Sequence, residues 1–177
     1  MRLMATLTLR AALWTEKHIA TYFKRKFGVE FDFVPQGWGS VYIDGEIGNF
    51  KIHPTSQLKS GAYIECKGNV EIGRHFHTGR GLVVMSSNHK YKEGMDLPYG
   101  KDYVRHRTVV KDYVWCGANV TILPGAVLED GCIVSAGSVV RGSFPKGSII
   151  AGNPAQLVSS RNAVQFKKQL ENAQRSE

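Results

Sequence analysis

The sequence is poor in cysteine and has no long apolar run, and both absences narrow the class of protein. Its 177 residues include three cysteines at wide spacings, which do not form a disulfide framework. We therefore expect a reducing, cytoplasmic compartment. No run of about 18 apolar residues occurs, so no transmembrane helix is predicted. Arg10 ends the first short apolar run, which is untypical of a secretion signal.

Motifs of covalent and nucleotide chemistry are absent as well. The chain has no Gly-x-Ser-x-Gly nucleophile elbow, no phosphate-binding P-loop and no Gly-x-Gly-x-x-Gly. Nucleotide hydrolysis and hydride transfer therefore have no supporting motif. The net charge of +8, from 23 basic and 15 acidic residues, favours anionic ligands. The basic residues follow no nucleic-acid-binding motif, so we expect no nucleic-acid partner.

What the sequence does contain is a repeat with a period of six. Members of the first series are all apolar: Val110, Cys116, Ile122, Leu128, Val134 and Val140. Members of the second are apolar or small: Val114, Val120, Ala126, Cys132, Ser138, Phe144 and Ile150. Most members of the third accept a positive φ at a turn corner: Asn119, Gly125, Gly131, Gly137 and Ser143. One inward aliphatic side chain and one turn residue per unit predict a parallel β-helix of hexapeptides, with three short strands per coil.

The first half of the chain repeats the pattern. Its inward series is Ile52, Leu58, Ile64, Val70, Phe76 and Leu82, and its corners are Asn69, Gly81 and, less typically, Tyr63 and His75. The phase breaks once, between Val84 and Val110, so residues of about 88–107 are predicted to leave the coil as a loop. Long loops inserted in a rigid scaffold are commonly functional.

Three segments follow from this pattern. We predict an N-terminal helical segment over 1–33, a β-helix domain over 34–159 that contains the loop, and a C-terminal helix over 160–177. Gly28 is the expected end of the first helix, and the C-terminal helix is expected to cover an open end of the coil. Residues 1–26 carry six Lys and Arg residues against one Glu, beside Leu, Trp and Phe. Such a segment either contacts an anionic membrane surface or packs on its own oligomer.

His89 stands at the start of the predicted loop, within Ser-Ser-Asn-His. Counted from Val84, its side chain faces outward, and Ser87 and Asn88 beside it can form hydrogen bonds. Imidazole is the side chain whose ordinary pKa suits proton abstraction near neutral pH. A surface histidine without a role is the alternative, but a position at a loop hinge on a rigid wall favours a general base.

The remaining histidines and the cysteines have structural interpretations. His75 and His77 are predicted on the outside of a coil, and no Cys or carboxylate joins the histidines at ligand spacing, so we predict no metal site. Cys66, Cys116 and Cys132 fall on inward positions and are predicted to be core residues, which leaves covalent catalysis without a candidate.

Outward and corner positions offer a surface for a ligand. Trp115 shares the outward phase of His89 and could form a wall for a flat or extended ligand, or a contact between subunits. Three small residues would leave a shallow groove between coils: Ala118, Ala136 and Gly137. Three basic residues lie near the Gly-Asn-Pro-Ala turn in the sequence and could meet phosphates: Arg141, Lys146 and Arg161.

The stretch from about 64 to 161 resembles the hexapeptide-repeat acyltransferases. The similar branch contains the galactoside, maltose and xenobiotic acetyltransferases and the O-acetyltransferases of bacterial surface polysaccharides. The resemblance rests on SSNHKY, DYVWCGANVTILPGAVLEDGCIVSAGSVV and AGNPA, in this order and spacing. There are two departures from the family pattern. Residues 141–144 read Arg-Gly-Ser-Phe where the family often has Thr-Lys-Asp, and Gln156 stands where a Lys or Arg commonly follows.

The resemblance implies an all-β fold, a left-handed parallel β-helix, in a homotrimer whose active sites lie between subunits. It implies acetyl-CoA as co-substrate, without a metal, and His89 as the general base. Trp115, Ala118 and Ala136 would line the coenzyme groove, with Gly137 beside them. The three basic residues named above are then candidates for the coenzyme phosphates, and Asn88, Tyr91 and His77 for acceptor binding. The expected reaction is O-acetylation of a sugar hydroxyl, in a surface polysaccharide or its precursor.

Three other functions stay open at this point. N-acetylation of an amino-sugar nucleotide would use the same fold, donor and base. A carbonic anhydrase on the same fold would bind zinc through histidines of two subunits, but the chain lacks the His-x4-His arrangement of that family. A non-catalytic β-helix could serve as a binding module, although the loop and the outward Trp115 disfavour this hypothesis.

Overall fold

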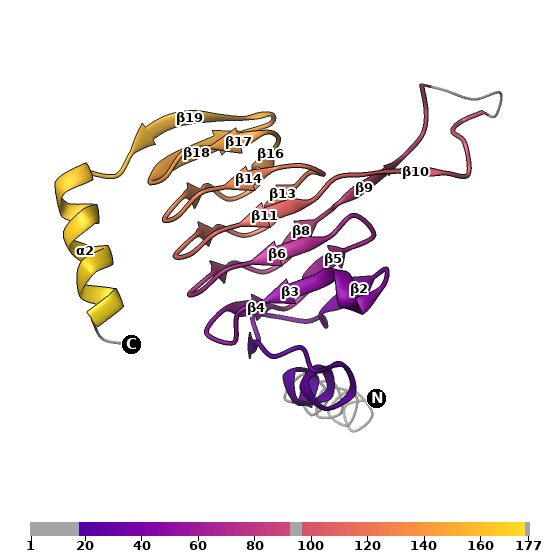
Figure 1. The fold of residues 1–177 in the computed structure, drawn as a ribbon, viewed down its shortest axis with the longest axis horizontal. Coiled ribbons are helices and arrows are strands. Elements are labelled where there is room, and N and C mark those ends of the chain that lie inside the picture. The colour runs from indigo at the N-terminus through magenta and orange to yellow at the C-terminus, as the bar shows by residue number, and fades with distance from the viewer. Residues whose placement is uncertain (1–17, 93–96, 176–177) are drawn as a thin grey trace, which may run out of the picture.

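The computed structural model describes residues 18–92 and 97–175, in which short parallel strands stack into three sheets around one core (Figure 1). Face 1 contains β3 (Phe50–Ile52), β6 (Val70–Ile72), β11 (Thr108–Val110), β14 (Val127–Leu128) and β17 (Ser143–Phe144). Face 2 contains β7 (His77–Thr78), β12 (Trp115–Cys116), β15 (Ile133–Val134), β18 (Ser148–Gly152) and β19 (Ala155–Ser160). Face 3 contains β2 (Tyr42–Asp44), β5 (Tyr63–Glu65), β8 (Val83–Val84), β13 (Thr121–Ile122) and β16 (Val139–Val140).

The chain visits face 1, face 2 and face 3 in turn and then returns to face 1. We name the turns between faces corner 1–2 (for example 111–114), corner 2–3 (117–120) and corner 3–1 (123–126). β4 (Gln57–Lys59) lies one coil before β7 and pairs with β1 (Asp32–Val34). A short 3-10 helix, η1 (Ile47–Asn49), forms corner 3–1 of the first coil. Only the last strand of face 2, β19, runs antiparallel to its neighbour among the three faces of the described structure.

The predicted inward series form the core. Between residues 110 and 150 the side chains of both series are buried, except for Phe144, which is half-buried. In the first half of the chain the buried members of the series are Leu58, Ile64, Val70, Phe76 and Leu82. Cys66, Cys116 and Cys132 are fully buried, and burial raises the pKa of each thiol, so these cysteines are core residues as predicted. The hydrophobic pattern alone therefore identified the interior of the stack.

The length of a coil varies, which a strict period of six does not allow. Thr121 pairs with Val139, a separation of 18 residues, but Phe50 pairs with Val70, a separation of 20. The last coil on face 1 is shorter, with Val127 opposite Ser143. As a result Phe50 is buried on face 1, whereas Ile52, the predicted inward residue, is half-buried.

Most predicted corners are turns with positive φ. Asn119, Gly125, Gly131 and Gly137 have φ between 55° and 81°, and Asn69, His75 and Gly81 also have positive φ. The prediction is wrong at Ser143 and Tyr63, which lie in strands. Gly142 and Gly61 take these corners instead, because the coils there depart from 18 residues.

The two helices occupy different positions on the stack. Residues 18–27 form a helix at the N-terminal end of the stack (Figure 1), which ends at Gly28 (φ 68°), as predicted. Its Phe23 ring packs on that of Phe31. The helix α2 (Ala163–Arg175) lies along the side of the stack, so the expectation that it covers an open end is wrong. Its Phe166 ring lies beside Gly131 and Gly147; a side chain at Gly131 would collide with the ring, and one at Gly147 would be in tight contact with it. No helix in the described ranges is long and apolar enough to cross a membrane.

Candidate functional site

The loop leaves the stack at corner 3–1 through a short antiparallel pair. β9 (Ser87–His89) pairs with β10 (Tyr103–Arg105), and His89 stands opposite Tyr103 (Figure 1). The His106 N–H donates to the Ser86 carbonyl oxygen (2.7 Å), which closes the base of the loop. The predicted insertion therefore has ordered β structure where it joins the coil.

A buried carboxylate fixes the point where the loop departs. Glu65, which is 4% exposed, accepts hydrogen bonds at Oε2 from the backbone N–H groups of Ser86 (2.9 Å) and Ser87 (2.8 Å). Its Oε1 accepts from the Ser87 hydroxyl (3.0 Å) and the Lys67 N–H (2.9 Å). These four donors occupy the acceptor sites of both carboxylate oxygens, which offsets the cost of burying the group. The sequence shows Glu65 only as one polar residue in a strand, so its role could not be predicted.

The His89 ring is held between two tyrosine rings. Its centroid lies 3.9 Å from that of Tyr99 and 4.3 Å from that of Tyr103. The Nδ1 atom is 3.3 Å from the Gly100 carbonyl oxygen, and the His89 N–H donates to Asn88 Oδ1 (2.9 Å). A carbonyl oxygen can only accept, so the hydrogen bond to Gly100 requires a proton on Nδ1. In neutral imidazole this leaves the lone pair of Nε2 free.

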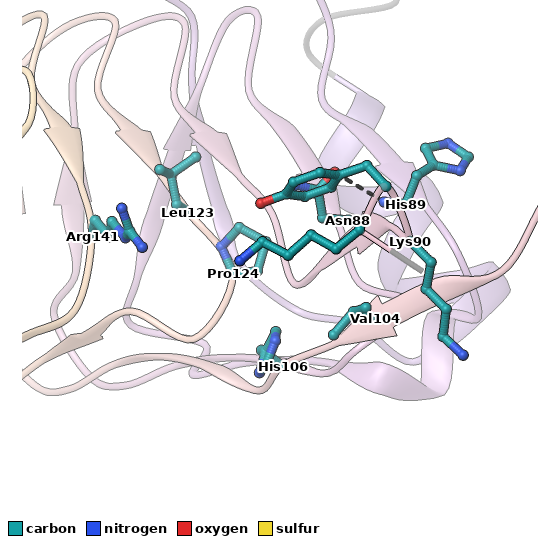
Figure 2. Close-up of a pocket in the computed structure, with 10 residues that line it drawn as sticks. Asn88, His89, Lys90, Val104, His106, Leu123, Pro124 and Arg141 are labelled. Atoms are coloured by element: carbon teal, nitrogen blue, oxygen red, sulfur yellow. Dashed lines mark hydrogen bonds between the residues drawn. The ribbon is translucent and has the colours of Figure 1, made fainter. Parts of the chain in front are cut away.

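His89 lies in a groove of about 500 Å³ at corner 3–1, which we call the His89 groove. Figure 2 shows Arg141 toward one end and His89 toward the other, with Leu123 and Pro124 between them. The lining residues are Asn88, His89, Lys90, Tyr91, Lys92, Val104, His106, Leu123, Pro124 and Arg141. This lining contains three cationic side chains and no carboxylate, so among the described residues the groove is electropositive and suits an anionic ligand. It brings together four predicted site residues: Asn88, His89, Tyr91 and Arg141.

A second groove, of about 740 Å³, lies between face 2 and α2. It gathers three further predicted residues, His77, Trp115 and Arg161, with Phe166 of α2 opposite. Trp115 is 54% exposed, so it faces outward as predicted. Burial lowers the pKa of His77, and the nearby His75 and Lys59 lower it further, which favours neutral imidazole there.

The small residues line an open strip at corner 2–3. The Ala118 backbone lies against Gly79 and that of Ala136 against Gly117, so successive coils stack closely there. The Gly137 N–H donates to the Ala118 carbonyl oxygen (2.9 Å), and in the described residues nothing lies within 4 Å of the place where a Gly137 side chain would be. The surface beside Gly137 is therefore open.

The other two predicted basic residues already have partners at corner 1–2. Arg161 Nε donates to the Gly131 carbonyl oxygen (2.7 Å), and its guanidinium carbon lies 5.1 Å from the centre of the Phe166 ring. Lys146 Nζ is 3.4 Å from Asp130 Oδ2. Arg161 thus helps to hold α2, while Arg141 has no ion-pair partner in the described part of the chain.

The predicted site residues therefore occupy three separate places in one chain. His89 and Arg141 share corner 3–1, the small residues lie at corner 2–3, and Trp115 and Arg161 line the groove beside α2. Each place is an open groove or strip, and none encloses a ligand alone. In residues 18–92 and 97–175, no three His, Cys, Asp or Glu side chains gather in a group that could hold a metal ion.

Part of the chain is similar to known hexapeptide-repeat proteins. The model of the bacterial transferase hexapeptide (six repeats) matches residues 107–142. The Escherichia coli protein WbbJ, named for O-acetyl transfer in lipopolysaccharide biosynthesis, is 34% identical over 113 residues, 60% of this chain and 58% of its own length. The chain thus spans less than two thirds of that relative.

Solved structures share the fold. A hexapeptide-repeat acetyltransferase from Vibrio cholerae superposes with a TM-score of 0.67 at 21% identity, over 82% of this chain and 80% of its own. A variant of the N-acyltransferase AntD from Bacillus cereus, in complex with dTDP and coenzyme A, superposes with a TM-score of 0.59 at 15% identity, over 87% and 95%.

Proposed function

We propose that this chain, which resembles the hexapeptide-repeat acetyltransferases, transfers the acetyl group of acetyl-CoA to a sugar hydroxyl. The acceptor would be a surface polysaccharide or its precursor. The observation that carries the proposal is His89, which is held between Tyr99 and Tyr103 with Nδ1 on a backbone carbonyl and stands in an electropositive groove. The similarity to WbbJ supports a hydroxyl acceptor. On the same resemblance we infer that the coil is left-handed.

The proposed chemistry is a direct transfer. His89 Nε2 takes the proton of the acceptor hydroxyl as its oxygen attacks the thioester carbonyl carbon. The tetrahedral intermediate then collapses, the C–S bond breaks, and the proton passes from the imidazolium to the sulfur, so that coenzyme A leaves as a thiol. A positioned base of this kind contributes about 10²–10⁴ in rate. No buried nucleophile is needed, consistent with the core positions of the cysteines.

The placement of the residues supports a site shared between subunits. Arg141 in the His89 groove has no ion-pair partner among the described residues, so it would be available for a coenzyme phosphate. Trp115, Ala118, Ala136 and Gly137 lie elsewhere on the same chain, and a neighbouring subunit could bring its copy of them to the groove. A closed three-fold ring would make three equivalent crevices. We therefore propose a homotrimer in the cytoplasm.

His89 is the residue with which to test the function. We expect His89→Ala to lower kcat for transfer of radiolabelled acetyl from acetyl-CoA to a sugar by at least about a hundredfold, and to leave assembly and acetyl-CoA binding intact. His53→Ala is a matched control, because the hydrogen bonds of the His53 side chain in the described structure go only to its neighbour Thr55 at corner 1–2. A His89→Ala enzyme that keeps most of its activity would rule out the general base.

N-acetylation of an amino-sugar nucleotide is the second candidate. The observation that favours it is the shared fold with AntD, an N-acyltransferase solved with dTDP and coenzyme A. The electropositive lining of the His89 groove would suit a nucleotide diphosphate as well as the coenzyme. Competition between a sugar and the matching amino-sugar nucleotide decides between the two, since an ester label is released by mild alkali and an amide label is not.

Contact with an anionic membrane stays a prediction. Much of the segment on which it depends, residues 1–17, lies outside the described residues. In the described part of the segment, Tyr22 and Phe27 are exposed beside Lys24, Arg25 and Lys26, a composition that suits an interface.

A further inference from the structure

Two exposed tyrosines lie side by side on face 3, on the coils that precede the loop. Tyr42 on β2 and Tyr63 on β5 pair directly in the parallel register, and they are 60% and 36% exposed. The positions that continue this row are Val83, Thr121 and Val139, which are smaller and half-buried. Residues in register on neighbouring strands lie about 4.8 Å apart, so the two rings can present one flat surface. We call this pair the Tyr42–Tyr63 strip.

A series of contacts connects the strip to His89. The Tyr63 hydroxyl donates to Asp44 Oδ2 (3.3 Å), and Lys67 Nζ pairs with the same oxygen (2.6 Å). Lys67 Nζ also lies 5.0 Å from the centre of the Tyr103 ring, which is 4.3 Å from the centre of the His89 ring. The Asp44 and Lys67 side chains are 47% and 27% exposed. Side-chain contacts therefore link the strip to His89 through the ion pair and Tyr103, although the strip lies outside the His89 groove itself.

The chemistry of this surface matches a carbohydrate longer than one sugar. Flat aromatic faces pack against the C–H faces of pyranose rings, and a tyrosine adds a polar tip at its edge. A carboxylate accepts hydrogen bonds and an ammonium group donates them, so the ion pair can bind hydroxyl groups of both orientations. Burial and, to a smaller extent, the neighbouring Asp44 raise the pKa of Tyr63, which keeps its hydroxyl a donor. A single sugar at His89 would leave the strip unused.

We propose that the Tyr42–Tyr63 strip is a second acceptor subsite, which binds a neighbouring sugar of an oligosaccharide whose reacting hydroxyl lies at His89. The inference rests on the proposed function and makes it narrower: the acceptor is an oligosaccharide or polysaccharide segment, not a monosaccharide. The Asp44–Lys67 pair would bind hydroxyl groups between the two subsites. A second copy of this chain is the alternative occupant of the strip, and the test separates the two.

The test measures acetyl transfer and binding as a function of acceptor length. The probe is an array of bacterial surface oligosaccharides of one to six sugars, grouped by repeat unit, with radiolabelled acetyl-CoA as donor. We expect kcat/KM to rise about tenfold from one sugar to two or three. Tyr42→Ala and Tyr63→Ala should remove that rise and leave kcat/KM for the single sugar within about twofold. Tyr42→Phe, which keeps the ring, should retain it, and Leu157→Ala, which removes an exposed apolar side chain from β19, should change nothing.

Each other outcome overturns either the subsite or the function. If labelling depends on His89 but shows no dependence on length, or if the alanine variants keep the rise, the subsite is wrong and the function stands. If oligosaccharides bind in a Tyr42-dependent manner but acetyl is never transferred, the proposed function is wrong, and the strip is a carbohydrate-binding surface without an acceptor role. Absence of any bound oligosaccharide overturns the subsite. If Tyr42→Ala instead shifts the oligomeric mass in light scattering and leaves the length dependence unchanged, the strip is a subunit contact.

Discussion

At the scale of single residues, the position of His89 depends on groups that come from two other parts of the chain. Tyr99 and Gly100 belong to the returning arm of the loop, whereas Glu65 belongs to the preceding coil. Glu65 does not touch the imidazole. It is a positioning residue, because it binds the backbone N–H groups of Ser86 and Ser87 just before the loop departs. The direction in which β9 leaves the stack follows from these bonds.

Glu65→Gln tests this positioning role. The amide replaces one acceptor oxygen by an N–H donor, which would face a backbone donor and cost about 1–3 kcal/mol of unfolding free energy. We expect kcat to fall about tenfold, with little change in KM for acetyl-CoA, since the base moves and the coenzyme contacts do not. Urea denaturation and steady-state kinetics measure the two effects.

Glu129→Gln is the matched control, a half-buried glutamate of another corner, for which the structure gives no side-chain hydrogen bond or ion pair among the described residues. A Glu65→Gln enzyme with lower stability but the kcat of the wild type would show that Glu65 supports only the fold.

At the scale of secondary-structure elements, α2 docks on the stack because glycine occupies two successive turns of corner 1–2. Gly131 and Gly147 stand in line with the corner residues His75 and Tyr113, whose rings stack 5.1 Å apart. The absence of side chains at the two glycines leaves the space that Phe166 fills. Arg161 adds a hydrogen bond to the Gly131 carbonyl, so α2 is attached at its N-terminal end and forms the wall opposite Trp115.

Gly131→Ala is expected to displace α2. The new Cβ would overlap the Phe166 ring, and the φ of 68° adds strain of about 1–2 kcal/mol. Gly142→Ala separates the two effects, because Gly142 has a φ of 81° but nothing within contact distance. Limited proteolysis should release the C-terminal segment from Gly131→Ala only, while both variants lose thermal stability. Equal protection of α2 in the two variants would contradict the docking role of Gly131.

At the scale of the whole molecule, the predicted site residues lie far apart on the surface of one chain. Corner 3–1 carries His89, the proposed base, and corner 2–3 and face 2 carry the small residues and Trp115. A rigid β-helix cannot bend these places together, because each coil is bonded to the coils above and below it. A shared site between subunits is the arrangement that would use all of them.

Mixed trimers test the shared site. His89→Ala removes the base, and Ala136→Trp would fill the strip at corner 2–3, so each variant alone should be inactive. When the two are refolded together, some crevices would combine the intact half of each subunit, and we expect a sizeable fraction of wild-type activity to return. The mass of the mixed species must be verified first. Mixed trimers as inactive as either parent would place both residues in one subunit's site.

The repeat itself could be read from the sequence, because in a β-helix each strand meets only its neighbours in the stack. Inward series such as Val110, Cys116 and Ile122 and corners such as Asn119 and Gly125 were predicted on that basis and are confirmed. The outward direction of Trp115 and the insertion at His89 follow from the same periodicity. These features depend on local alternation between inward and outward side chains, which a period of six encodes directly.

Tertiary structure alone decided the features that depend on contacts between residues distant in the sequence. The bonds of Glu65 to Ser86 and Ser87, the tyrosine rings around His89 and the seat of Phe166 on Gly131 have no signature at short range. Coil lengths of 16 to 20 residues on face 1 shifted two predicted corners, because a longer or shorter turn changes the register without changing the apolar pattern. Periodicity determined which side chains face inward, and packing between distant segments determined what surrounds His89.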